Sequence, residues 1–268
     1  MTRLPRSLAA ALIAGLLWSS MRTAGAADAE ARPDGAAAAS NAYAVVALVG
    51  DRISVIRYRP TVGSSLDQNR LQEVVVQDDH YDRLATRVAV DAVHAAFPDA
   101  QVQGVRLADP APFGAPGALS GSDDRLPALL AAVRSQLGDR APRYLLVLSK
   151  HRDDAHLKTD SGTLGSGKLS GLGFYIDAET RMKRTATGER GRGFVAPYAY
   201  VTASLVDLRD GAVVRFENVE ETTTRANVGE GTDLDPWNAL TADQKVRLLD
   251  AMLTRAVRAA VAHVVAPG

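Results

Sequence analysis

Residues Arg143–Ser149 have the sequence RYLLVLS, and this stretch decides the fold class. Its unbroken apolar centre is typical of a strand that is buried on both faces of a sheet. Before it come a helical pattern over about residues 80–97, a β pattern over Val102–Leu107 and a second helical pattern over Ser122–Leu137. With a first strand after Tyr43, this order predicts a parallel or mixed sheet with covering helices.

The segment before the first helix is expected to form a hairpin. Tyr43–Arg59 carries two runs of β-favouring residues on either side of Gly50–Asp51, a typical hairpin turn. Leu71–Val76 is expected to add a short strand. Asp78–Asp79 can cap the helix that follows, and Pro98 ends that helix.

The C-terminal half predicts a hairpin and a long helix. Tyr198–Leu208 and Val213–Thr224 flank the strong turn signal Asp210–Gly211. Thr241–Gln244 has the pattern of a capping box at the start of the last helix. We therefore expect a single α/β domain of two or three layers with a mixed sheet, ordered β-α-β-α-β, then a β-hairpin and a C-terminal helix.

Composition excludes several classes of protein. The chain has 268 residues, 31 basic against 31 acidic, and no cysteine. A neutral chain is not a general nucleic-acid binder. Without cysteine there is no disulfide framework, no thiolate metal site and no lipid-anchored N-terminal cysteine. We expect one domain over residues 43–268, with a polar, glycine-rich and basic excursion at about 151–197.

The N-terminus has the three parts of a secretory signal peptide. A basic start is followed by 12 residues of apolar character, Ser7–Trp18, and by the small residues Ala24–Ala26. The apolar run is too short to span a bilayer, which needs about 20 residues. We expect a signal peptide over residues 1–26, cleaved near Ala26, and a flexible Ala-rich linker over 27–42. The mature protein is then periplasmic or secreted, with no transmembrane span.

Tyr200–Arg215 (YVTASLVDLRDGAVVR) carries a family resemblance. It is similar to a hairpin of the TolB amino-terminal domain and of the curli-assembly and penicillin-binding-protein-activator lipoproteins. The resemblance implies a non-catalytic envelope protein that docks onto other envelope components. The chain lacks the lipobox cysteine of those lipoproteins. Gly162–Gly193 also lacks the sustained alternation of a pore-forming strand pair.

The segment directly after the RYLLVLS strand is a candidate metal site. His151, Asp153, Asp154 and His156 place two imidazoles and two carboxylates within six residues. Imidazole nitrogen and carboxylate oxygen suit Zn²⁺ or Mn²⁺. Functional loops often follow strand ends in α/β sheets. The alternative is a solvated loop with no ligand.

One segment is strongly basic, with only Glu189 opposing its charge. It contains Arg181, Lys183, Arg184, Arg190 and Arg192. Such a segment is expected to bind an anionic surface, either a membrane, lipopolysaccharide phosphates or an acidic protein partner. The alternative is a solvated hairpin tip. No aromatic residue is interleaved, so nucleic acid is not expected.

A glycine-rich loop resembles a phosphate-binding loop but lacks one of its parts. Its residues are Gly162, Gly165, Gly167 and Lys168. Leu169 stands where the Mg²⁺-binding hydroxyl belongs, so we expect a flexible loop and no cofactor.

The leading hypothesis is an exported, non-enzymatic envelope protein that acts by protein–protein contact in envelope assembly or maintenance. No complete catalytic motif is present, since G-x-S-x-G is absent. Two alternatives stay open: a periplasmic metal-dependent hydrolase that uses the His151–His156 cluster, and a small-ligand binder that uses the Gly162–Gly173 loop.

Overall fold

A computed structural model describes residues 42–50, 52–60, 68–116, 123–160, 162–183, 186–228 and 235–266. The expected signal peptide, and all but the last residue of the expected linker, lie outside these residues. Arg184 of the basic segment lies outside them as well.

The described residues form one α/β domain with a ten-stranded mixed sheet and three α-helices, which confirms the expected fold class. The strands of this sheet are β1 (Ala42–Leu48), β2 (Arg52–Arg57), β3 (Arg70–Val75), β4 (Gln101–Val105), β5 (Tyr144–Lys150), β6 (Arg152–Asp154), β9 (Lys168–Lys183), β10 (Arg190–Asp207), β11 (Val213–Thr222) and β12 (Arg225–Val228). The α-helices are α2 (His80–Ala96), α3 (Arg125–Leu137) and α4 (Ala242–Val265). A separate two-stranded ribbon pairs β7 (Leu157–Thr159) with β8 (Gly162–Leu164), and the 3₁₀ turns are η2 (Ala111–Phe113), η3 (Gly138–Arg140) and η4 (Pro236–Ala239).

The long strand β10 organises the sheet. It pairs antiparallel with β9 up to Tyr200 and with β5 from Val201 onward. The same residues of β10 also pair with β11, so β5 and β9 must lie end to end along the opposite edge. Next to them, β1 is parallel to β5 and β2 is parallel to β9. The sheet therefore has a break, where β1 gives way to β2 and β5 gives way to β9.

The hairpin expected over Tyr43–Arg59 is wrong for this reason. Both edges of β1 are occupied by β4 and β5, and β2 pairs with β3 and β9 instead. Gly50 has a φ of 82° and lies between two strands that keep the same direction. Gly50, which in the sequence predicts a reversal of the chain, lies instead at the break between β1 and β2.

The side-chain cap expected from Asp78–Asp79 is also wrong. Asp79 is the N-cap residue of α2, with φ 46°, and its side chain makes no capping hydrogen bond. Its carboxylate instead pairs with Arg106. The capping box of the last helix is confirmed, because Thr241 and Gln244 bond to each other's backbone N–H groups.

Residues 151–197, expected to be an excursion, contribute mostly to the sheet. They supply all of β9 and the first part of β10, which are the two longest strands. The part from β6 to β8 forms an insertion at the break: β6 pairs with the start of β9, off the main path of strands, and Gly171 of β9 pairs with β10 next to the partner of Lys150. The polar composition reflects one exposed end of a long hairpin, while its other end is buried.

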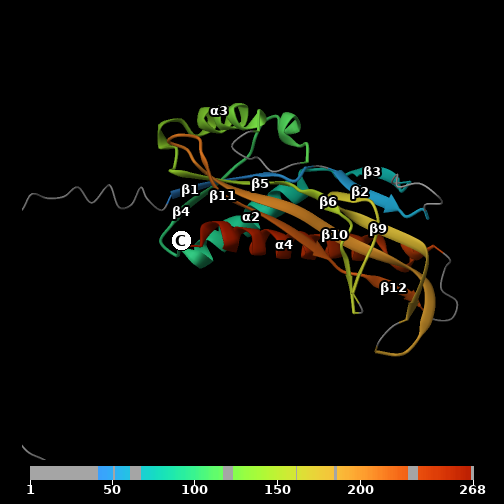
Figure 1. The fold of residues 1–268 in the computed structure, drawn as a ribbon. Helices are drawn as coiled ribbons and strands as arrows, with labels where there is room; N and C mark the ends of the chain where they lie inside the picture. The colour runs from blue at the N-terminus through green and yellow to red at the C-terminus, as the bar shows by residue number, and fades with distance from the viewer. Residues whose placement is uncertain are drawn as a thin grey trace, which may run out of the picture. The chain divides into compact units, whose positions relative to one another are not determined.

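The helices cover the two faces of the sheet unequally, as Figure 1 shows. α2 and α4 lie on one face over a large core that includes Leu146, Phe174 and Leu253. On the other face α3 covers the half that contains β1 and β5. The remaining half is covered by the β6–β8 insertion, whose Leu157 packs beside Tyr200. The break in the sheet lies between these two covered halves.

Asp82 ties α2 to the break. Its Oδ1 accepts a hydrogen bond of 2.9 Å from the Gly50 N–H. The pKa of this carboxyl is raised to about 6, mainly by burial and in smaller part by Asp79, while the N–H groups of Gly50 and Val49 and the charge of Lys150 oppose the shift.

We predict that this carboxyl makes the fold less stable as pH rises. Between its ordinary pKa and about 6, the folded state holds the proton that the unfolded state has lost. The contribution of Asp82 to the free energy of unfolding should therefore fall as pH rises from 4 to 7, by up to about 3 kcal/mol at 1.36 kcal/mol per pKa unit. Asp82→Asn should remove that fall, as measured by urea unfolding across this range. Asp91→Asn, an exposed change on the same helix, should keep it; equal profiles for wild type and Asp82→Asn would contradict the prediction.

Candidate metal centre

His151 lies where the chain leaves the edge of β10. Its N–H donates to the Tyr200 carbonyl and its own carbonyl accepts from the Gly171 N–H, both at 3.0 Å. Its ring stacks on the Tyr200 ring, with centroids 6.2 Å apart and planes at 21°. The residue is only 8% exposed. Backbone pairing and ring stacking together fix the imidazole at the break in the sheet.

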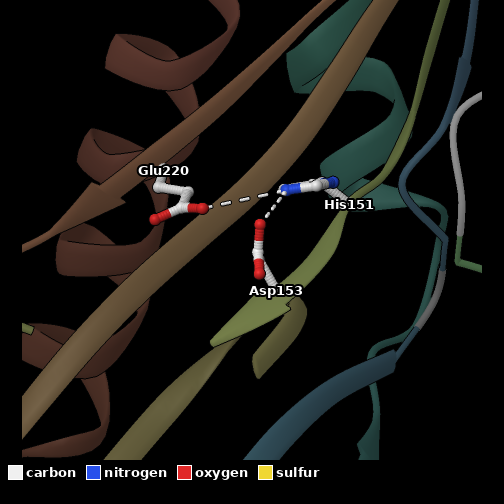
Figure 2. Close-up of side chains that lie close together, drawn as sticks. All are labelled: His151, Asp153 and Glu220. Atoms are coloured by element: carbon white, nitrogen blue, oxygen red, sulfur yellow. Dashed lines mark ion pairs between the residues drawn. The ribbon is translucent and has the colours of Figure 1, made fainter. Parts of the chain in front are cut away.

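Two carboxylates face this imidazole, as Figure 2 shows. His151 Nε2 lies 3.5 Å from Asp153 Oδ2 and 3.8 Å from Glu220 Oε1. Both distances exceed an ordinary N–H···O hydrogen bond of about 2.7–3.2 Å. Nε2 is itself buried without a hydrogen-bond partner among the described residues. A buried nitrogen without a partner is costly, so the position favours a ligand between the three groups.

The spacing fits a small cation. The three ligand atoms lie within 4.8 Å of one another. Zinc bonds of about 2.0–2.1 Å in a tetrahedron place neighbouring ligand atoms roughly 3.3 Å apart. A modest contraction of the cluster would therefore complete three of four ligand positions. One imidazole and two carboxylates suit Zn²⁺ or Mn²⁺.

Glu220 was missed by the sequence analysis. It lies on β11, where its register partner is Tyr200, the residue beneath the His151 ring. Since paired residues of neighbouring strands share a face, this register brings Glu220 to the imidazole. The hairpin itself is visible in the sequence, but its register is not, because a bulge lies between Leu205 and Val206.

The other two predicted ligands do not reach His151 Nε2. His156 Nδ1 lies 2.9 Å from Glu220 Oε2, and this contact raises the pKa of His156. It orients the carboxylate, as groups around a metal site commonly do. Asp154 points elsewhere, with its Oδ1 2.8 Å from Lys168 Nζ.

The segment between these residues is anchored by one hydroxyl and one backbone amide. Tyr200 OH accepts from the His156 N–H and donates to the Asp154 carbonyl, both at 3.0 Å. The Asp154 N–H donates to Asp153 Oδ1 at 2.7 Å and lowers the pKa of Asp153. Asp153 is therefore ionised, as a metal ligand must be.

The glycine-rich loop does not have the surroundings of a phosphate-binding loop. Gly162 begins β8, while Gly165 and Gly167 lie in the connection to β9. Lys168 starts β9, and its amine pairs with Asp154. A strand follows where a phosphate-binding loop requires a helix.

The basic residues lie at the exposed end of the β9–β10 hairpin. Arg190 pairs in register with Lys183, and Arg192 pairs with Arg181. The Arg192 guanidinium also forms an ion pair with Glu179. The hairpin therefore gathers four of the five predicted cations.

No family model matches the chain, and no curated protein matches it. Among solved structures, it is similar to the PelC dodecamer from Paraburkholderia phytofirmans, with 14% identity, a TM-score of 0.32, and coverage of 85% of this chain and 89% of the other. Protein XCC0632 from Xanthomonas campestris, of family DUF330, has 13% identity and a TM-score of 0.35 over 82% of this chain and 80% of the other. A putative neuraminyllactose-binding hemagglutinin homolog from Helicobacter pylori has 7% identity and a TM-score of 0.33 over 81% and 80%. All three proteins are bacterial.

The resemblance to the TolB amino-terminal domain and the related lipoproteins is wrong, because the structural likeness is to PelC, the DUF330 protein and the hemagglutinin homolog. The hairpin that carried it does exist as β10 and β11. An Asp-Gly hairpin sets a local reversal of the chain and leaves the order of the other strands open.

Within the described ranges, no helix is both long enough and apolar enough to cross a membrane.

Proposed function

We propose that this chain is an exported protein of the bacterial cell envelope that holds one divalent transition-metal ion between His151, Asp153 and Glu220. The observation that carries the proposal is the buried His151 Nε2, which has no hydrogen-bond partner among the described residues and faces two carboxylates. The signal-peptide pattern of residues 1–26 supports export.

The protein is proposed to act by contact with other envelope proteins. Phe216 lies on the same face of β11 as Glu220, since the register with β10 is continuous between them and alternate residues of a strand share a face. Its side chain is about half exposed, at 52%. An exposed apolar side chain on the face that carries a metal centre favours a protein partner. Three protein ligands also leave a fourth position open, which a partner's side chain or water can fill.

The metal is tested by its stoichiometry. Mature protein loaded with Zn²⁺ and then desalted should retain about one ion per chain, measured by inductively coupled plasma mass spectrometry. His151→Ala and Glu220→Gln should each lose most of it, because each removes one of three ligands. Wild-type protein that retains no zinc would contradict the proposal.

The control is His263→Ala, which removes another histidine that pairs with a β11 glutamate, at 3.4 Å from Glu217. This variant should retain about one zinc ion per chain, like the wild type. Urea unfolding of each variant separates metal loss from loss of fold, and a folded Glu220→Gln variant with full zinc would exclude Glu220 as a ligand.

A second function is proposed for the β9–β10 hairpin, which we infer binds an anionic membrane surface or an acidic partner. Its cations are paired directly across two strands, Arg190 with Lys183 and Arg192 with Arg181. Like charges placed opposite each other destabilise a strand pair. An anionic surface would offset the repulsion between these facing cations.

Sedimentation with vesicles tests the hairpin. The protein should bind vesicles that contain phosphatidylglycerol at 20 mM salt, and binding should fall several-fold at 300 mM because salt screens surface charge. Arg181→Ser/Lys183→Ser/Arg190→Ser should abolish it. Arg247→Ser/Arg258→Ser, which removes two exposed cations of α4, should leave it unchanged. Equal loss in both variants, or equal binding to neutral vesicles, would contradict the assignment.

A further inference from the structure

A cavity of about 830 Å³ lies at the break in the sheet, separate from the metal cluster. It begins where the parallel strands β1 and β5 end, at Leu48 and Lys150. The start of α2 and the η2 turn also line it, through Asp82 and Pro110. Crevices beyond the carboxyl ends of parallel strands are the usual ligand sites of α/β sheets. This cavity also has the size of a small-molecule site.

Two glycines make room for one lysine in this cavity. A Cβ at Gly50 would lie 2.9 Å from Lys150 Nζ, and a Cβ at Gly171 would lie 3.0 Å from Lys150 Cγ. Both glycines have positive φ, 82° and 60°, which other residues rarely adopt. Gly50 and Gly171 therefore leave space for the Lys150 side chain along the break, with its amine next to Gly50.

The charges that line the cavity do not cancel. Three pairs are internally neutral: Arg52 with Glu73, Asp79 with Arg106, and Lys168 with Asp154. Asp82 accepts the Gly50 N–H and contributes one negative charge near Lys150, against the two positive charges of Lys150 and Arg152. Lys150 and Arg152 line the cavity and have no ion pair within the part of the chain that the structure describes. Ser170 Oγ lines it too, and is buried without a hydrogen-bond partner there. These donors point to an anionic ligand.

Apart from Ser54, the remaining residues that line the cavity are apolar or glycine. Leu48 and Ile56 are buried, and Leu71 on β3 is 61% exposed. An exposed leucine at the rim of a cavity can cover the apolar part of a ligand. A free inorganic ion would make no apolar contact with these side chains, whereas an alkyl chain would.

We propose that this cavity binds a small amphiphilic anion, a carboxylate or phosphate monoester that carries a short alkyl chain. Lys150 and Arg152 hold the anionic group, with Ser170 Oγ as a further donor. Leu48, Ile56 and Leu71 pack against the chain. This site is independent of the proposed metal centre.

Calorimetric titration of metal-free mature protein tests the proposal, with octyl phosphate and octanoate below their micelle-forming concentrations. At least one of the two should bind saturably at one per chain, and the comparison assigns phosphate or carboxylate. Lys150→Met should weaken binding at least tenfold, about 1.4 kcal/mol. Arg152→Gln changes an exposed residue and should also weaken anion binding. Leu71→Asp should weaken binding because it removes an apolar contact with the alkyl chain and adds a negative charge.

The matched control is Lys158→Met, a lysine of β7 outside the cavity, which should bind like wild type. Three results would overturn the proposal: no saturable binding of either anion, equal binding of neutral octanol, or full affinity in folded Arg152→Gln and Lys150→Met. If inorganic phosphate binds as tightly as octyl phosphate, the alkyl chain does not pack against Leu48, Ile56 and Leu71, and that part of the proposal is wrong. Metal loss in Glu220→Gln leaves this titration unaffected, so the two sites can fail separately.

Discussion

The backbone pairing of β10 at Tyr200 and Val201 is the constraint on which the rest of the structure depends. One edge of this long strand is shared by β5 and β9, so Val201 pairs with Lys150 and Tyr200 with Gly171. Residues between Lys150 and Gly171 must leave the edge of β10 and return to the same point. His151 is the first residue to leave, and the Tyr200 carbonyl and the Gly171 N–H both bond to its backbone.

This junction places two different functional groups next to each other, the His151 imidazole and the Lys150 amine. His151 turns its ring onto Tyr200 and meets Glu220 from the opposite edge of β10. Lys150, one residue earlier, lies along the break between Gly50 and Gly171. Neighbouring residues of a strand point to opposite faces, so a metal ligand and an anion-binding amine can follow each other in the chain. The proposed metal and the proposed anion therefore depend on the same interruption of the sheet.

The sequence predicts helices and strands well where the spacing of the apolar residues agrees with the residues that cap or flank the element. The RYLLVLS strand, the helices near residues 80–97 and 122–137, and the capping box at Thr241 all appear close to their expected bounds. Gly50 predicts a hairpin turn in the sequence but lies at a break between two strands, because a glycine with positive φ fits either position. His151 and Asp153 could be singled out because they are neighbours in the chain. Glu220 could not, since 69 residues separate it from His151 and only the register of β10 with β11 brings it near.

The central claim is that His151, Asp153 and Glu220 hold a metal, and anomalous diffraction tests it most directly. Crystals of the mature protein grown with excess Zn²⁺ would be measured on both sides of the zinc absorption edge. The account predicts a peak about 2.0–2.2 Å from His151 Nε2 and from one oxygen of each carboxylate. Ordered density for all three side chains with no peak between them, and His151 Nε2 hydrogen-bonded directly to a carboxylate, would contradict it.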